Sequence, residues 1–357
     1  MKLHNFISLN ANTARMGISM RIKRAVRYAA AGMALGAGIS MIPAAQAAET
    51  PQCELKRAVR FGGMNWESNL VLVEIERFIM EKGYGCKTDV LPTETLPALA
   101  ALERGDLDIN TEIWLNTIFG PWSKAEKTGK VKRIGDLYAG GEAWFIPRYT
   151  AEKLPALKKV SDLPKFKDAF KDPEEPNKGR FYGCPAGWGC EIVNANLHKA
   201  LGLNSSFTLY SPGTGAAQKA ALISAYKRKQ DIVFYYWYPT SLVGSLDLVR
   251  LEFPPYNAAD QACLTDAACK TPKATAYPDN PVFTAVNTRF AQEAPQLTSF
   301  LSRVNVPLPV MEKTLAYMEE SGDDAAAVAR WFLKNKPEIW TTWLSEDTAL
   351  RIKTALR

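Results

Sequence analysis

The residues best suited to binding chemistry lie in one short stretch from Cys184 to Glu191, with the sequence CPAGWGCE. Its one large aromatic ring, Trp188, is flanked by glycines that let another molecule come close. The next residues, 192–200, have a helical pattern, so the amides that follow Trp188 lie at a helix N-terminus, which attracts anions. An aromatic face for a cation beside donors for a carboxylate predicts a site for a small zwitterion. A buried tryptophan in a disulfide-pinned turn is the alternative.

Six cysteines follow residue 47, namely Cys53, Cys86, Cys184, Cys190, Cys263 and Cys269. An even number of cysteines in a secreted chain predicts disulfides and an oxidising compartment. Local spacing favours Cys184–Cys190 and Cys263–Cys269, which leaves Cys53–Cys86. Spacing alone does not settle how Cys53, Cys86, Cys263 and Cys269 pair. His198 is the one histidine beyond residue 47. We therefore expect no metal site, no cofactor and no Ser–His–Asp or Cys–His catalytic set.

The first 47 residues have the three parts of a secretory signal peptide. Residues 21–27 are basic, residues 29–42 form an apolar run rich in Ala and Gly, and Ala45-Gln46-Ala47 matches a cleavage site. The apolar run is too short and too rich in Gly to span a membrane well, which argues against an N-terminal anchor. We expect a cleaved signal peptide and a periplasmic protein, with Met1 and Met20 both open as the start.

Charge argues against nucleic acid as a partner. The chain has 44 Lys and Arg against 37 Asp and Glu, but six of the basic residues lie in the first 47, which carry no acidic residue. The 38 basic side chains that remain nearly balance the 37 acidic ones. A body so close to neutral lacks the basic surface typical of proteins that bind nucleic acid or an anionic membrane.

The elements that must position the stretch alternate between strand and helix patterns. Strand patterns cover residues 58–62, 86–91, 107–114, 207–210 and 232–236, and helical patterns separate them. This order predicts α/β architecture with parallel strands. Polar, Pro-rich sequence from Arg148 to Arg180 indicates a crossing into a second lobe. Three tryptophans near the C-terminus, Trp331, Trp340 and Trp343, are interpreted as packing residues.

Two segments repeat one pattern. In residues 101–114 and again in 224–237, a helix ends, an Asp-Ile pair opens a strand, and a tryptophan follows six residues after the Asp, as Trp114 and Trp237. In open α/β sheets, ligands bind beyond the carboxyl ends of the strands. Two such lobes facing each other predict a cleft with tryptophan on both walls. The match is short, so chance is the alternative.

Three runs of this sequence resemble a known family. Residues 183–191 closely resemble the signature loop of the glycine betaine/proline betaine-binding periplasmic proteins of osmoprotectant ABC importers, an OpuAC-like substrate-binding family. Residues 232–239 and 110–114 resemble the strands of that family that carry its other two binding tryptophans. The likeness covers most of residues 58–340 in order and spacing.

This resemblance implies a type II periplasmic binding protein with two α/β lobes, a hinge and a ligand cleft between them. The signal peptide is then 1–47, the first lobe 48–146 plus 280–357, and the second lobe 147–279. The resemblance also implies a box of Trp114, Trp188 and Trp237 for the cation, and carboxylate binding by the amides of Gly189 and Cys190. It implies a monomer that passes a betaine to a membrane permease and its ATPase, and that catalyses nothing.

Several positions depart from the family pattern. Ile118 stands where the family has a histidine, four residues after Trp114. Glu112 lies two residues before Trp114, so a regular strand would point both side chains the same way. Trp66 and Trp144 are further candidates for the cleft. If Glu112 faces the ligand, it favours a cation with N–H groups, such as proline or histidine, and choline and carnitine are also open. A salt bridge at the lobe edge is the other interpretation of Glu112.

A secreted enzyme that acts on a similar small molecule is the competing hypothesis. Such an enzyme needs convergent acid–base groups in its cleft. The sequence offers aromatic rings and backbone amides near Trp188, with Glu112 and Glu191 as the obvious carboxylates. A binding protein is therefore the favoured interpretation.

Overall fold

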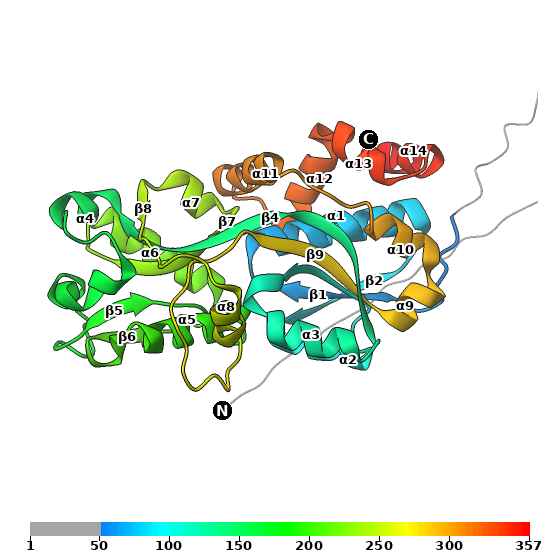
Figure 1. Ribbon diagram of the computed structural model, residues 1–357. Coiled ribbons are helices and arrows are strands. Elements are labelled where there is room, and N and C mark those ends of the chain that lie inside the picture. Colours follow the sequence, from blue (N-terminus) through cyan, green and yellow to red (C-terminus); the bar gives the residue numbers. More distant parts are fainter. Residues whose placement is uncertain (1–50) are drawn as a thin grey trace, which may run out of the picture. The chain divides into compact units, whose positions relative to one another are not determined.

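Two strand–helix–strand–helix–strand units form the frame of the computed structural model, which describes residues 51–357 (Figure 1). The first unit consists of β1 (Val59–Met64), α1 (Glu67–Tyr84), β2 (Thr88–Thr93), α2 (Thr95–Arg104) and β3 (Ile109–Trp114). The second consists of β5 (Gly179–Tyr182), α5 (Gly189–Ala200), β6 (Phe207–Tyr210), α6 (Gly215–Lys227) and β7 (Val233–Tyr238). In both units the first strand lies between the other two and pairs with them in parallel. The repeated sequence pattern therefore corresponds to a repeated parallel α/β unit.

Two long strands join the units. β4 (Val131–Pro147) pairs antiparallel with β9 (Asn280–Asn287) through Gly140 and with β7 from Gly141 onward. β9 also pairs with β3, and β8 (Leu248–Arg250) pairs with the end of β4. The strand order is β2-β1-β3-β9-β4-β7-β5-β6. β4 thus belongs to both lobes. The predicted lobe boundaries, 146/147 and 279/280, fall at the end of β4 and the start of β9 and stay a prediction.

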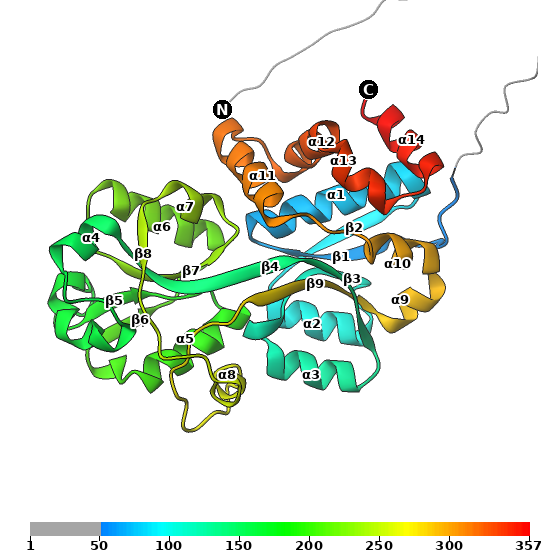
Figure 2. The ribbon, with the colours of Figure 1, turned by 45° about the horizontal axis from the view of Figure 1, so that its top comes forward.

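The remaining elements cover the two sheets. They are η1 (Leu115–Thr117), α3 (Phe119–Lys127), α4 (Arg148–Lys153), η2 (Val160–Phe170), η3 (Leu203–Ser205), α7 (Ser241–Ser245), α8 (Ala258–Leu264), α9 (Thr288–Glu293), α10 (Pro295–Leu301), α11 (Leu308–Ser321), α12 (Ala325–Asn335), α13 (Pro337–Trp340), η4 (Thr341–Trp343) and α14 (Glu346–Ala355). The helices from α11 to α14 lie over α1 (Figure 2). Trp340 and Trp343 are buried there, and Trp331 stacks on Tyr317, which confirms their interpretation as packing residues.

An aspartate anchors the start of each strand that carries a repeated tryptophan. Asp108, just before β3, is buried and accepts hydrogen bonds from the guanidinium of Arg57 at 2.6 Å and the backbone N–H of Arg60 at 2.8 Å. Asp231, just before β7, accepts from Thr150 Oγ1 at 2.9 Å and Lys153 Nζ at 2.5 Å. Because each strand is fixed at its start, its tryptophan is held at the opposite, carboxyl end.

Three disulfides, Cys53–Cys86, Cys184–Cys190 and Cys263–Cys269, follow the pairing that local spacing favours. Within residues 51–357, none of the helices is both long enough and apolar enough to cross a membrane. The signal peptide assigned to residues 1–47 lies outside the described residues.

Candidate functional site

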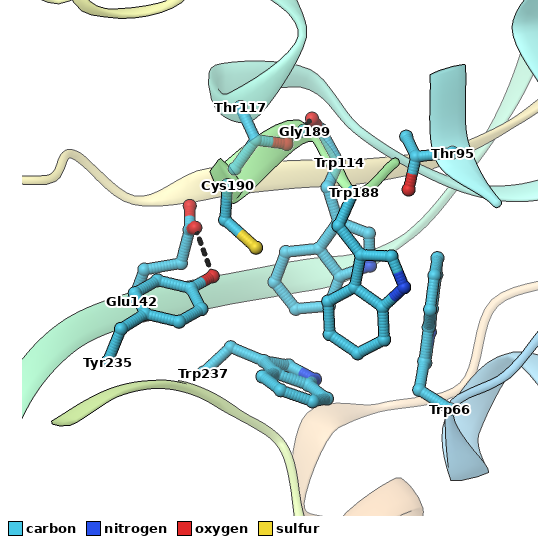
Figure 3. A pocket seen from close by; sticks show the side chains of 10 residues that line it. All are labelled: Trp66, Thr95, Trp114, Thr117, Glu142, Trp188, Gly189, Cys190, Tyr235 and Trp237. Carbon is cyan, nitrogen blue, oxygen red and sulfur yellow. Dashed lines mark hydrogen bonds between the residues drawn. The ribbon is translucent and has the colours of Figure 1, made fainter. Parts of the chain in front are cut away.

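A pocket lies where the two lobes meet (Figure 3). Its lining residues come from both lobes, and five of the ten are aromatic. They are Trp66, Thr95, Trp114, Thr117, Glu142, Trp188, Gly189, Cys190, Tyr235 and Trp237. Six of these ten were candidates from the sequence: Trp66, Trp114, Trp188, Gly189, Cys190 and Trp237.

Four of the ten lining residues are tryptophans. The ring centroid of Trp188 lies 5.1 Å from that of Trp66 and 5.1 Å from that of Trp237, with interplanar angles of 71° and 78°. Trp237 is also stacked on Tyr236, which covers one of its faces. Trp114 packs edge-on against Tyr138. Indole faces that border the pocket can attract cations.

The start of α5 comes unusually close to the first lobe. A Cβ atom on Gly189 would lie 2.5 Å from Ile118 Cγ2 and 2.7 Å from Thr117 Oγ1, so this position needs glycine in the observed arrangement of the lobes. Trp188 is the N-cap residue of α5, and the amides of Gly189 and Cys190 are the first two of the helix. These N–H groups, at the positive end of the helix dipole, suit an anionic group in the pocket.

The disulfide-closed loop is also held by hydrogen bonds. The N–H of Gly187 donates to the carboxylate of Glu191 at 2.7 Å, and Ser211 Oγ donates to the carbonyl of Cys184 at 2.7 Å. Glu191 is thus engaged within its own loop and does not line the pocket. The loop presents Trp188 from a frame fixed at both ends.

We expect the Cys184–Cys190 bond to stabilise the fold and to shape the site. Replacing both residues by Ser should lower the free energy of unfolding by about 2 kcal/mol, because a short loop loses its covalent closure. The matched control replaces Cys263 and Cys269, which have the same sequence separation of 6 and lie outside the pocket. Urea unfolding should show similar losses for both double variants. Glycine betaine titration should show weaker binding only for the first, and equal weakening in both would contradict a shaping role.

Glu112, which we expected at the ligand from the sequence, does not line the pocket. Its backbone φ of 66° departs from strand geometry, and the β3–β9 register shifts between Asn110 and Ile113. The alternation that would align Glu112 with Trp114 is therefore broken. The carboxylate instead lies behind the pocket wall. It accepts hydrogen bonds from the indole of Trp66 and the hydroxyl of Tyr138.

Burial raises the pKa of the Glu112 carboxyl to about 7, although its hydrogen-bond donors act in the opposite direction. Trp66 and Tyr138 therefore donate to a Glu112 carboxyl that becomes mostly protonated, and so mostly uncharged, below neutral pH. Glu112 does not line the pocket itself but contacts Trp66, which does. A salt bridge at the lobe edge, the other interpretation, does not fit either, since Glu112 is 1% exposed and its hydrogen-bond partners are neutral.

Trp144, a second candidate for the cleft from the sequence, also does not line the pocket. It is fully buried, its indole N–H donates to Asn194 Oδ1 at 2.7 Å, and its ring packs against Phe181. Trp144 lies on β4 two residues beyond Glu142, farther from the pocket and beneath α5. The residue of this strand that lines the pocket is Glu142.

Glu142 is paired with Trp237 across the β4–β7 ladder, which brings it to the pocket. It is 6% exposed. Its Oε1 accepts from the Tyr235 hydroxyl at 2.6 Å and its Oε2 from Asn280 Nδ2 at 2.6 Å. Burial raises the pKa of Glu142 to about 7, with these two hydrogen bonds opposing the rise. The pocket therefore holds a carboxyl whose charge changes near neutral pH.

Four lining residues, Thr95, Thr117, Glu142 and Tyr235, were not among the sequence candidates. The spacing of Glu142 before Trp144 mirrors that of Glu112 before Trp114 and was the available signal for it. Tyr235 lies two residues before Trp237, so strand alternation could have placed it on the same face. Nothing in the local sequence marks the two threonines. Among residues 51–357, no cluster of three or more His, Cys, Asp or Glu is arranged to hold a metal ion.

Known proteins match most of this chain. A family model, the substrate binding domain of ABC-type glycine betaine transport system, matches residues 57–335. The trimethylamine N-oxide-binding protein of Pelagibacter ubique (strain HTCC1062) is 25% identical over 289 residues, which are 78% of this chain and 87% of that protein. The glycine betaine-binding periplasmic protein OusX of Dickeya dadantii (strain 3937) is 26% identical over 216 residues, 58% of this chain and 64% of that protein.

Solved structures share the fold. An ABC-transporter choline binding protein in complex with choline aligns with a TM-score of 0.68 at 19% identity, covering 84% of this chain and 98% of that chain. The architecture is that of a type II periplasmic binding protein, with two α/β lobes and a cleft between them. The family match spans most of the chain, so this protein belongs to the family of substrate binding domains of ABC-type glycine betaine transport systems and is the substrate-binding component of an ABC importer.

Proposed function

We propose that the protein captures a small methylated ammonium zwitterion, such as glycine betaine or proline betaine, and releases it to a membrane permease with its ATPase. The observation that carries the proposal is the wall of four tryptophans around one small pocket. A quaternary ammonium has no N–H donor, so direct hydrogen bonds cannot hold it. Indole faces can, at about 0.5–2 kcal/mol for each ring.

The other end of such a ligand also finds a partner. The amides of Gly189 and Cys190 begin α5 on the wall of the pocket, and Thr95 lines the same space. A ligand carboxylate placed there accepts hydrogen bonds from the helix N-terminus. This arrangement supports the predicted roles of Gly189 and Cys190, with Trp114, Trp188 and Trp237 around the cation and Trp66 as a fourth ring.

Glu142 supports a second candidate class of ligand. The described residues that line the pocket include this carboxyl but no Lys, Arg or His. An ionised Glu142 favours a ligand with net positive charge, such as choline. A neutral Glu142 can donate a hydrogen bond to a ligand oxygen, including that of an amine N-oxide. Proline, histidine and carnitine belong in the same test because their ammonium groups also suit an acidic, aromatic pocket.

The remaining expectations fit this role. We propose that residues 1–47 are removed as a signal peptide, and that the protein works as a periplasmic monomer without catalysis. Glu142 and Tyr235 are hydrogen-bonded to each other. They do not form the separated acid and base that an enzyme needs.

Calorimetric and thermal unfolding titrations with glycine betaine, proline betaine, choline, carnitine, proline, histidine and trimethylamine N-oxide test the proposal. A specific ligand at a hundredfold excess over its Kd stabilises the folded state by about 2.7 kcal/mol. We expect at least one methylated ammonium compound to do so and to be recovered unchanged. Stabilisation by none of them would overturn the proposed function, and recovery of a converted product would favour the enzyme hypothesis.

A further inference from the structure

The loop that carries Trp188 belongs to the second lobe, but the polar atom of its ring is bound by the first lobe. Trp188 Nε1 donates to Glu94 Oε2 at 2.5 Å and lies 3.2 Å from Asn65 Oδ1. Asn65 Nδ2 in turn donates to Glu94 Oε1 at 2.8 Å. Glu94 thus accepts from both neighbours, and the acceptor that orients the indole comes from across the cleft.

The backbone repeats the same contact between lobes. Glu94 is the N-cap residue of α2, but its side chain makes no capping hydrogen bond to its own helix. The amide of Leu96, in the first turn of α2, instead donates to the carbonyl of Gly187 at 3.1 Å. The first lobe therefore uses a carbonyl of the second lobe to satisfy a helix N-terminus, which would otherwise lack an intrahelical acceptor.

The fit at this contact leaves little free space. A Cβ atom on Gly187 would lie 3.0 Å from Glu94 Cβ, and the φ of Gly187 is +84°, a conformation that glycine tolerates best. Glu94 is half-buried, and burial raises the pKa of its carboxyl while the Trp188 hydrogen bond opposes the rise. When the lobes separate, Trp188 must lose Glu94 as its acceptor, and Leu96 must lose Gly187.

We propose that Glu94 is a positioning residue for ligand retention, which holds the Trp188 ring over the pocket only while the lobes are closed. This inference rests on the proposed function for its ligand, but the contact itself does not. Its consequence is kinetic. A ligand enters the open cleft before the Glu94–Trp188 bond forms, so the bond should slow ligand release much more than it speeds capture.

The first test measures ligand release by stopped-flow tryptophan fluorescence. The probe is whichever of glycine betaine, choline and trimethylamine N-oxide binds the wild-type protein most tightly. Glu94→Ala should release the probe about tenfold faster or more, because a charge-assisted hydrogen bond to the Trp188 ring is lost. The association rate should change less than threefold. Glu94→Gln keeps an acceptor for the indole and should restore most of the retention. Glu103→Ala, on the same helix and outside the pocket, is the matched control and should match the wild type.

The second test needs no ligand. Hydrogen exchange at the Trp188 indole N–H and the Leu96 amide should be faster in Glu94→Ala than in the wild type, and unchanged in Glu103→Ala. Equal exchange in Glu94→Ala and wild type would overturn the positioning role, as would an unchanged release rate. Failure of the wild type to bind any of the three probes would instead overturn the proposed function. The exchange measurement would still test whether Glu94 holds Trp188. Thermal unfolding of each variant verifies that the fold is intact.

Discussion

Trp188→Ala should weaken glycine betaine binding by about 2–4 kcal/mol, which corresponds to a loss of affinity of roughly thirtyfold to a thousandfold. Trp66, Trp114, Trp188 and Trp237 form a cage of tryptophans around the pocket. Trp188 is its central ring, in edge contact with both Trp66 and Trp237. Its removal takes away one cation–π partner and leaves two other rings without support. The loss should therefore exceed that for Trp114→Ala, whose ring packs against Tyr138 instead.

Trp331→Ala is the control for general destabilisation. Trp331 stacks on Tyr317 at 4.1 Å between centroids, and it does not line the pocket. We expect its loss to lower stability while leaving ligand affinity nearly unchanged, as measured by titration below the unfolding temperature of each variant. Equal losses of affinity in Trp188→Ala and Trp331→Ala would show that the cage is not responsible for binding.

The cage could be predicted from the sequence because local patterns fix where its members point. Trp114 and Trp237 lie at the carboxyl ends of equivalent strands, each anchored at its start by an aspartate. Trp188 precedes a helix in a loop closed by two cysteines six residues apart. Strand period, helix start and cysteine spacing are all short-range features, so the chain shows them without a structure.

The rest of the site depends on features that the sequence does not show. Strand alternation predicted Glu112 wrongly, because a positive φ at that residue breaks the alternation. Trp144 also does not line the pocket, because it lies two residues beyond Glu142 on β4, where its indole N–H donates to Asn194 of α5. Glu94 and Thr117 meet the second lobe only through closure, so neither carries a local signal.

The three buried glutamates, Glu76, Glu112 and Glu142, differ in what they can do to a ligand. Glu76 is fully buried and accepts from Thr111 Oγ1 at 2.6 Å, away from the pocket. Glu112 lies behind the pocket wall, where it accepts a hydrogen bond from Trp66. Glu142 alone of the three is part of the pocket wall. Selectivity by ligand charge, which the sequence analysis attributed to Glu112, is therefore a role that Glu142 is better placed to fill.

Glu142→Gln should weaken choline binding by about 2–3 kcal/mol at pH 8 and affect glycine betaine much less. Choline carries a net positive charge, so removal of a buried partner charge costs it heavily. Glycine betaine carries its own carboxylate, which an ionised Glu142 repels, and this repulsion offsets part of the attraction to the ammonium group. Gln keeps the shape and an acceptor for Tyr235, so the change is one of charge.

We also expect the choline affinity of the wild type to depend on pH, because the charge of Glu142 does. The pKa of Glu142 is raised to about 7, so in the ligand-free protein the Glu142 carboxyl is mostly ionised at pH 8 and mostly neutral at pH 6. A bound cation favours the ionised form, and wild-type choline affinity should accordingly fall as pH decreases from 8 to 6. Glu142→Gln should remove that dependence. Glu112→Gln, which alters a carboxyl of similar pKa behind the wall, should keep it. Calorimetric titration of the three proteins at both pH values measures the effect. A pH dependence that survives in Glu142→Gln and disappears in Glu112→Gln would return the selectivity role to Glu112, acting through the ring of Trp66.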